Sequence, residues 1–281
     1  VIAGSGGLSQ TGSGTTILTG TNTYTGPTLV TLGTLQIGAG GTVGSIRAES
    51  TLSVGSGATL AFNRSDTLLQ GVDFNALIAG SGRLTQMGPG TLILSGSNTY
   101  SGSTSVSGGI LQLGTGGVSG ALNPAGNITL ASGGTFRFNR SDTVTQGTQF
   151  GNAITGAGAV VQAGSGTVVF TSGNTYTGNT LISAGTLQLG TGGGTGSLGG
   201  AGTIQVDSGA TLVLNRSNTL LQNLELGPVI SGSGSVVQAG SGTTVFTGAN
   251  TYSGQTSIQA GSLQLGGGAL SGSLNPASAI G

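Results

Sequence analysis

The chain has 281 residues, a formal net charge of zero, and only six arginines and six acids. Histidine, cysteine and lysine are absent, which removes the commonest metal ligands, disulfides and the usual general base at neutral pH. Without a basic surface to neutralise phosphates we expect no nucleic-acid binding, and we expect no cofactor, no metal and no catalytic residue. Because 35% of the residues are apolar and only 4% are charged, the chain is expected to fold.

A fixed 76-residue repeat organises the whole chain. Asn-Thr-Tyr begins at Asn22 and returns at Asn98, Asn174 and Asn250, with no insertion or deletion between copies. Such a period predicts a stacked array in which neighbouring units bury each other's apolar faces. We therefore predict one domain over 1–281, made of repeats 1–76, 77–152, 153–228 and the partial repeat 229–281.

Each repeat contains three copies of a short apolar phrase, which predict short strands. In the second repeat they cover residues 90–94, 109–113 and 134–138, and the next copy ends at Phe170, so the spacings between their ends are 19, 25 and 32. Period-two alternation with glycine punctuation favours strands joined by tight corners. These spacings predict an all-β, right-handed parallel β-helix (a β-solenoid) with three turns per 76-residue repeat and about 11 turns in all, at roughly 25 residues per turn with strands about 4.8 Å apart.

One residue of each phrase is expected to form an inward column along the coil, one residue per turn. Its members are Leu18, Ile37, Phe62, Leu94, Leu113, Phe138, Phe170, Leu189, Leu214, Phe246 and Leu265. The longest apolar run is residues 76–79, so no transmembrane segment is predicted in this fragment. Because both ends fall at or inside repeats, we expect the chain to be an excerpt of a longer array.

Part of each repeat resembles a known family. Gly88-Pro-Gly-Thr-Leu-Ile-Leu-Ser-Gly-Ser-Asn-Thr-Tyr-Ser-Gly102, followed by Gly109-Ile-Leu-Gln-Leu-Gly114, is similar to the autotransporter-associated β-strand repeat, and all four repeats carry the pattern. The resemblance implies a passenger domain of type V secretion, at the cell surface of a Gram-negative bacterium or outside it. It also implies an outer-membrane barrel elsewhere in the parent protein.

Two sets of recurring side chains are candidate surface contacts. The tyrosines could form an aromatic row that stacks on sugar rings, or could simply pack over their own corners, which is the simpler interpretation. Arg64 and Arg140 could pair with an acid two residues later, at exposed corners where an ion pair contributes little, whereas Arg216 is followed by Asn218 at that place. The candidates are Tyr24, Tyr100, Tyr176, Tyr252, Arg64, Arg140 and Arg216.

Several charged residues interrupt the repeat, since their counterparts in other copies are uncharged. They are either solvated positions free to vary or part of a recognition face. They are Arg47, Glu49, Arg83, Arg137, Asp207 and Glu225.

The sequence favours a non-enzymatic, surface-exposed β-helical rod of an autotransporter-like protein, acting as adhesin or stalk through repeated weak contacts. Its partners would be a host surface or glycan. The alternative is a structural subunit of an extracellular filament or biofilm fibre, in which like chains associate end to end or laterally. The acids do not recur as the carboxylate pair that glycoside cleavage needs, so no enzymatic activity is expected.

Overall fold

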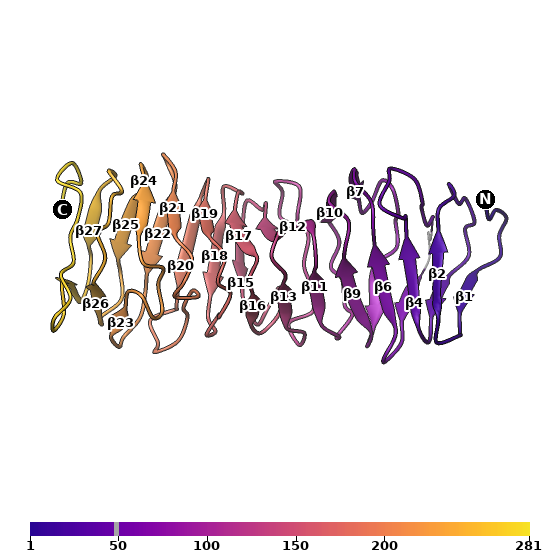
Figure 1. Ribbon diagram of the computed structural model, residues 1–281, viewed down its shortest axis with the longest axis horizontal. Helices are drawn as coiled ribbons and strands as arrows, with labels where there is room; N and C mark the ends of the chain where they lie inside the picture. Colours follow the sequence, from indigo (N-terminus) through magenta and orange to yellow (C-terminus); the bar gives the residue numbers. More distant parts are fainter. Residues whose placement is uncertain (48–50) are drawn as a thin grey trace. The chain divides into compact units, whose positions relative to one another are not determined.

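A computed structural model describes residues 1–47 and 51–281 of the chain, and its ribbon is shown in Figure 1. The described residues form two compact units: Val1–Phe136 with Thr148–Asn152, and Arg137–Gly147 with Ala153–Gly281. Each unit is a coil of short strands, turns and bends, and no described residue is helical. The expectation of a single domain over the whole chain stays a prediction.

Three parallel sheets run through the first unit. The first contains β1 (Leu8–Gln10), β3 (Thr28–Val30), β5 (Leu52–Val54) and β8 (Ile78–Gly80). The second contains β2 (Thr15–Leu18), β4 (Thr34–Ile37), β6 (Thr59–Phe62), β9 (Arg83–Gln86), β11 (Thr104–Val106) and β13 (Ile128–Leu130). The third contains β7 (Thr67–Leu69), β10 (Thr91–Leu94) and β12 (Gly109–Leu113).

The second unit has the same construction. One sheet contains β15 (Thr143–Thr145), β18 (Thr167–Phe170), β20 (Thr186–Leu189), β22 (Thr211–Leu214), β25 (Ser235–Gln238) and β27 (Thr256–Ile258). The others contain β17 (Ala159–Gln162), β19 (Thr180–Ile182), β21 (Ile204–Val206) and β24 (Ile230–Gly232), and then β23 (Leu220–Leu221), β26 (Thr243–Phe246) and β28 (Ser262–Leu265). The remaining strands are β14 (Gly134–Phe138), which contains the boundary between the units, and β16 (Ile154–Gly156).

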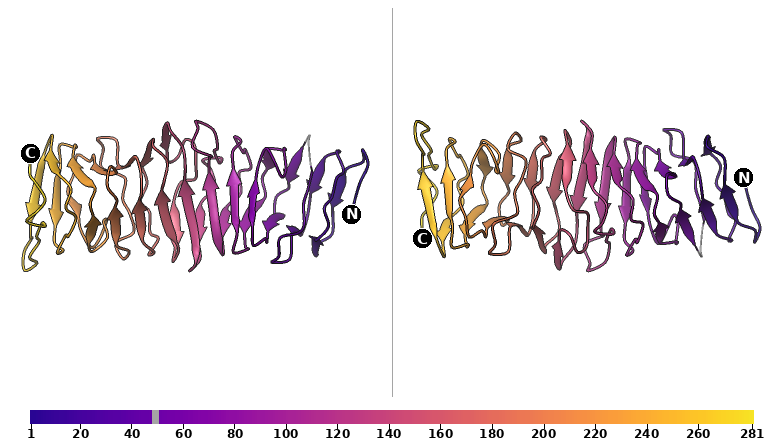
Figure 2. Two further views of the ribbon diagram at one scale, coloured as in Figure 1. Left: turned by 90° about the horizontal axis from the view of Figure 1, so that it is seen from above. Right: turned by 90° about the horizontal axis from the view of Figure 1, so that it is seen from below.

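The pairing confirms the predicted fold class, a parallel β-solenoid of about 10 turns. Leu94 pairs with Leu113 on the next turn, as the 19-residue spacing predicts, and both side chains are buried. The rest of the predicted inward column is also buried, apart from Leu265 on the last strand, β28. The two further views in Figure 2 show the turns of each unit from above and below.

The predicted 32-residue turn is wrong, because it is a shorter turn followed by a step to another sheet. Phe62 pairs with Gln86 of β9, and Leu92 of the next repeat pairs with Leu68 rather than with Leu60. The strand β10 therefore follows β9 directly in the chain but lies in a different sheet. The second unit repeats this step between β25 and β26. Each repeat thus makes its three turns and then moves on by one sheet.

A glycine with positive φ begins the second apolar phrase of every repeat. Gly109 has a φ of 59°, and its counterparts Gly33, Gly185 and Gly261 have values of 60° to 67°. A Cβ at Gly109 would lie 2.2 Å from the carbonyl oxygen of Gly90 on the preceding turn. Only glycine fits both the backbone conformation and the close approach, which explains its recurrence in the sequence.

Candidate functional site

The four tyrosines lie inside the coil, at the corner that follows each Asn-Thr pair. Each ring is at most 2% exposed. The hydroxyls of Tyr24 and Tyr100 lie 2.6 Å from the hydroxyls of Thr28 and Thr104, and the same pairing recurs in the other two repeats. Burial raises the pKa of these phenols. The interpretation of the tyrosines as a surface row is therefore wrong, and packing over the corner is what the structure shows.

The asparagine of the same motif joins a buried polar cluster that links one repeat to the next. The Asn98 side-chain oxygen accepts hydrogen bonds from Gln70 Nε2 and from the Ile78 amide, both at 2.9 Å. The pairs Gln146–Asn174 and Gln222–Asn250 repeat the contact at 2.7 Å. Because buried amides must be paired, this corner has a structural role.

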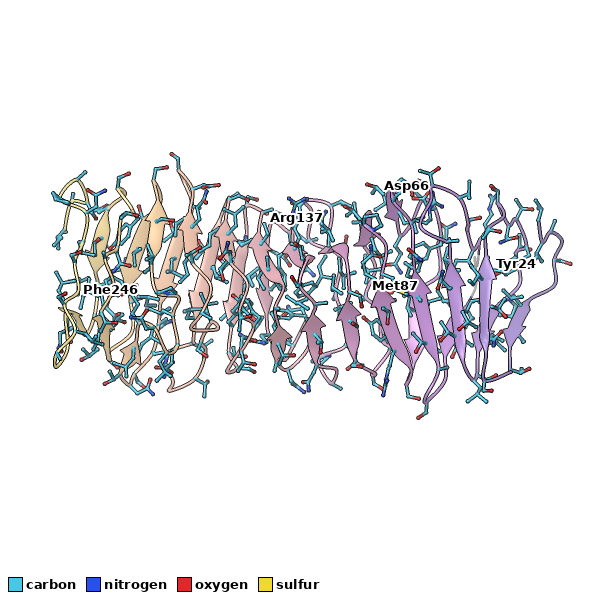
Figure 3. All side chains as sticks on the ribbon, viewed as in Figure 1. Tyr24, Asp66, Met87, Arg137 and Phe246 are labelled. Carbon is cyan, nitrogen blue, oxygen red and sulfur yellow. The ribbon has the colours of Figure 1, made fainter. Side chains whose placement is uncertain are left out.

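The candidate arginines lie at a second corner and are also mostly covered. The side chains of Arg64, Arg140 and Arg216 are 13%, 7% and 5% exposed. Arg64 Nε donates to Asp66 at 2.8 Å, Nη2 donates to the same carboxylate, and Nη1 donates to the carbonyl of Gly44 at 2.6 Å. The expectation that this arginine lies at an exposed corner is therefore wrong. Its partner, Asp66, lies at the upper edge of the coil in Figure 3.

The arginine keeps an acid partner even where the sequence of the corner changes. Asn218 replaces the aspartate in the third repeat and accepts from Arg216 Nε at 2.9 Å. The ion pair there is made by Glu225, whose Oε1 lies 2.6 Å from Arg216 Nη1. In the first two repeats the arginine, by donating to the carboxylate, holds the pKa of Asp66 and of Asp142 below the usual value.

The outer face of the large sheet in the second unit is a neutral surface that the sequence analysis did not single out. Parallel pairing places five hydroxyl side chains in one row, on neighbouring strands about 4.8 Å apart. The row consists of Thr143, Thr167, Thr186, Thr211 and Ser235, all at least partly exposed. The signal was present in the Gly-Thr-Leu phrase, because alternation puts its threonine outside when its leucine is inside.

The other charged residues do not gather into a reactive site. Within the described residues, no group of three or more His, Cys, Asp or Glu side chains is placed to hold a metal ion. Asp207 accepts a hydrogen bond from Gln205 on the surface, and Glu49 lies outside the described residues. The described part of the chain also holds no helix with the length and hydropathy of a membrane span.

Repeats of 76 residues coiled into parallel sheets define a β-solenoid repeat protein, and comparison with known sequences identifies which kind. The sequence model of the family described as passenger-associated-transport-repeat matches residues 8–37, 84–113, 160–189 and 236–265. The chain therefore carries four copies of this repeat, and the recognition of an autotransporter passenger repeat is confirmed.

A curated relative agrees with this family. The chain is 32% identical, over 93% of its length, to a protein named adhesin BmaC autotransporter, from Brucella suis biovar 1 (strain 1330). The matched region is 10% of that relative, so the chain spans about a tenth of the length of the curated protein it matches. No solved structure matches the chain.

Proposed function

We propose that this chain is a surface-exposed segment of an autotransporter adhesin, and that it makes contacts rather than catalysing a reaction. The observation that carries the proposal is the likeness of almost the whole chain to a protein named as an adhesin, in a region built from the passenger repeat. The structure supports it with a closely hydrogen-bonded coil in which the four tyrosines and the arginines Arg64, Arg140 and Arg216 are used internally. The partner would be the glycan or protein surface of another cell.

The contacts would be made by outer sheet faces rather than by the buried tyrosines. Rows of uncharged threonine and serine side chains on neighbouring strands offer many weak hydrogen bonds, and repetition raises avidity without a single strong pocket. Within each unit, however, equivalent phrases of successive repeats lie in different sheets, as β18 and β26 do. Equivalent residues of successive repeats would thus face different sides of the coil, so a partner could be contacted on more than one side.

Two measurements test the proposal. Antibodies raised against the 281-residue chain should label intact cells that produce the parent protein, and labelling only after cell lysis would contradict a surface location. Beads coated with the chain should bind host cells, and a version lengthened by one further repeat should bind more at equal coating density. If lengthening leaves binding unchanged, repeated contacts are not the mode of adhesion.

A variant of the hydroxyl row locates the contact surface. The double variant Thr186→Lys, Thr211→Lys would place two charges in the middle of the row without touching the buried face. We expect cell binding to fall several-fold if the neutral face makes contact. The control is Ser53→Lys, at a partly exposed position on β5 of the first unit and outside that row.

A further inference from the structure

One triplet of each of the first three repeats fits the acceptor pattern for N-linked sugars. The pattern is an asparagine, any residue except proline, and then serine or threonine, on the surface of an exported protein. Here it takes the form Asn-Arg-Ser, at the corner that follows β6, β14 and β22. Because a three-residue pattern arises easily by chance, a site also requires an asparagine that is free to react. The triplets begin at Asn63, Asn139 and Asn215 and end at Ser65, Ser141 and Ser217.

The asparagine side chain at this corner is not used by the fold. All three asparagines are partly exposed, and within the described residues none of their side-chain amides forms a hydrogen bond or is closed off from solvent. The asparagines of the Asn-Thr-Tyr motif differ, since they are buried and hydrogen-bonded, as Asn98 is. The backbone of Asn63 is nevertheless fixed, because its amide donates to the Ile37 carbonyl and its carbonyl accepts from the Gly40 amide, both at 2.8 Å. The side-chain nitrogen is therefore available on an ordered corner.

The backbone conformation of the corner does not require asparagine or serine either. Asparagine often occupies corners because it tolerates the left-handed region. In the described part of the chain, however, Asn223 is the one non-glycine residue with a positive φ, and it lies outside the triplets. The three serines are exposed, and no hydrogen bond of their hydroxyls is found among the described residues. The residue that the corner uses is the arginine between them, as the ion pairs of Arg64 and Arg216 show.

The residues around the triplet vary between repeats, whereas the triplet does not. The strand position two residues before it is Ala61, Arg137 or Val213. The loop position ten residues after its asparagine is Asp73, Gln149 or Glu225. Duplication of a repeat copies these positions together with the triplet, so they have changed while the asparagine and the serine have been kept. This difference favours a use of the two residues outside the fold.

Open space lies beside the asparagine side chain. A Cβ on Gly40 would have Asn63 Oδ1 as its nearest neighbour, at 3.9 Å, and a Cβ on Gly41 would meet nothing within 4 Å. Gly192 repeats this beside Asn215, where the distance from its Cβ to Oδ1 would be 3.8 Å. A group attached to the asparagine nitrogen therefore has room above these glycines.

We infer that Asn63, Asn139 and Asn215 each carry a sugar in N-glycosidic linkage. In the transfer, Nδ2 forms a bond to C1 of a sugar activated as a glycosyl diphosphate, the C1–O bond breaks, and the diphosphate leaves with the bonding electrons. One proton passes from Nδ2 to a base of a separate transferase, so this chain is only the acceptor. Sugar hydroxyls would hydrate the surface of a chain in which only 4% of the residues are charged. The inference does not rest on the proposed function, because the modification precedes any contact with a partner.

Peptide mass spectrometry with electron-transfer fragmentation tests the inference on the parent protein, purified from the bacterium that makes it. Peptides with the three asparagines should each carry the mass of one or more sugar residues on the asparagine. Peptides with Asn75, which is exposed but is followed by Ala76 and Leu77, should be unmodified. Unmodified asparagines at all three corners, or sugar on the serine oxygens instead, overturn the inference.

The mass that is found also identifies the donor. Single hexoses, or short chains of variable length, indicate a nucleoside-diphosphate sugar that is transferred one residue at a time. A fixed oligosaccharide indicates a preassembled glycan on a lipid diphosphate. Both results support the acceptor sites, because the bond to Nδ2 is the same.

Variants of the first triplet separate the acceptor pattern from the fold. Ser65→Ala keeps the asparagine but breaks the pattern, so sugar occupancy at Asn63 should fall at least tenfold, whereas Ser65→Thr should retain it. Asn63→Gln should remove the sugar from this corner, and the matched change Asn75→Gln should leave occupancy at all three corners unchanged. Sugar retained on Asn63 in Ser65→Ala, or lost in Ser65→Thr, refutes the assignment. Mass spectrometry reads occupancy even in a variant that does not fold, and circular dichroism identifies such a variant.

Discussion

Three glycines of the second repeat differ in backbone conformation and in the space around the missing Cβ. Their substitution therefore distinguishes the cost of backbone strain from the cost of a close contact. Gly109 has a φ of 59°, and a Cβ there would lie 2.2 Å from the Gly90 oxygen and 2.4 Å from the Gly88 oxygen. Gly133 has a φ of 88° but open space around its missing Cβ. Gly117 has neither a positive φ in the left-handed region nor a neighbour within 4 Å. Alanine substitution at the three sites therefore forms a matched series.

The magnitudes follow from these geometries. An L-residue in the left-handed region costs about 1–2 kcal/mol, and the loss of unfolded-state entropy returns about 0.4–1 kcal/mol, so Gly133→Ala should destabilise by about 1 kcal/mol. Gly109→Ala carries the same strain and must also push two carbonyls away, which adds about 1–3 kcal/mol as overpacking does. Gly117→Ala should be neutral or stabilise by up to about 1 kcal/mol.

Urea unfolding followed by far-UV circular dichroism measures the series, with the midpoints compared at matched slopes. We expect the free energy of unfolding to decrease in the order Gly117→Ala, wild type, Gly133→Ala and Gly109→Ala. If Gly109→Ala and Gly133→Ala lose the same stability, the contact with the preceding turn contributes nothing. The explanation of the recurring glycine would then reduce to backbone conformation alone.

Other predictions concern the buried groups. Tyr100→Phe should destabilise the chain by about 1–3 kcal/mol in thermal or urea unfolding, because it leaves the Thr104 hydroxyl buried without its partner; an unchanged midpoint would contradict that contact. Leu113→Asp should disrupt its turn by burying an unpaired charge, and retained protection of nearby amides in hydrogen exchange would show that the position is not interior. Since the pKa values of Asp66 and Asp142 are lowered in the fold, their stabilisation is present above the unfolded value of about 3.9 and is lost as the pH falls through the folded value. The Asp66→Asn, Asp142→Asn double variant should lose less stability than wild type as the pH falls below about 4, and identical acid profiles would refute the linkage.

The sequence predicted the coil because apolar alternation, glycine corners and an unbroken period all indicate stacked parallel strands. It did not predict the step between sheets, because the residue that follows Phe62 in the stack is a polar one. Gln86 is 2% exposed and paired with Phe62, and its amide donates to the carbonyls of Gly88 and Gly90 inside the coil. The apolar pattern does not mark the strand that contains Gln86. It therefore indicates one long turn from Phe62 to Leu94, where the structure has a shorter turn from Phe62 to Gln86 and then a step to another sheet.

The candidate site was harder to predict because one spacing fits both a buried row and an exposed row. The tyrosines recur once per repeat in either case, and only their partner decides between the two. That partner was visible in the sequence as a threonine four residues later, at Thr28 and Thr104 and in the other two repeats.

The step of one sheet per repeat bears on how such a gene can change in length. Removing or duplicating one whole repeat leaves every strand beside a partner of the same kind, since each repeat begins on the sheet next to the one used by its predecessor. Whatever follows the altered point is turned by one sheet, and a different side then presents the same residues. An insertion of a single residue within a strand instead moves inward side chains outward for the rest of that strand. Recombination between repeats can therefore redirect what this protein displays without a single point mutation.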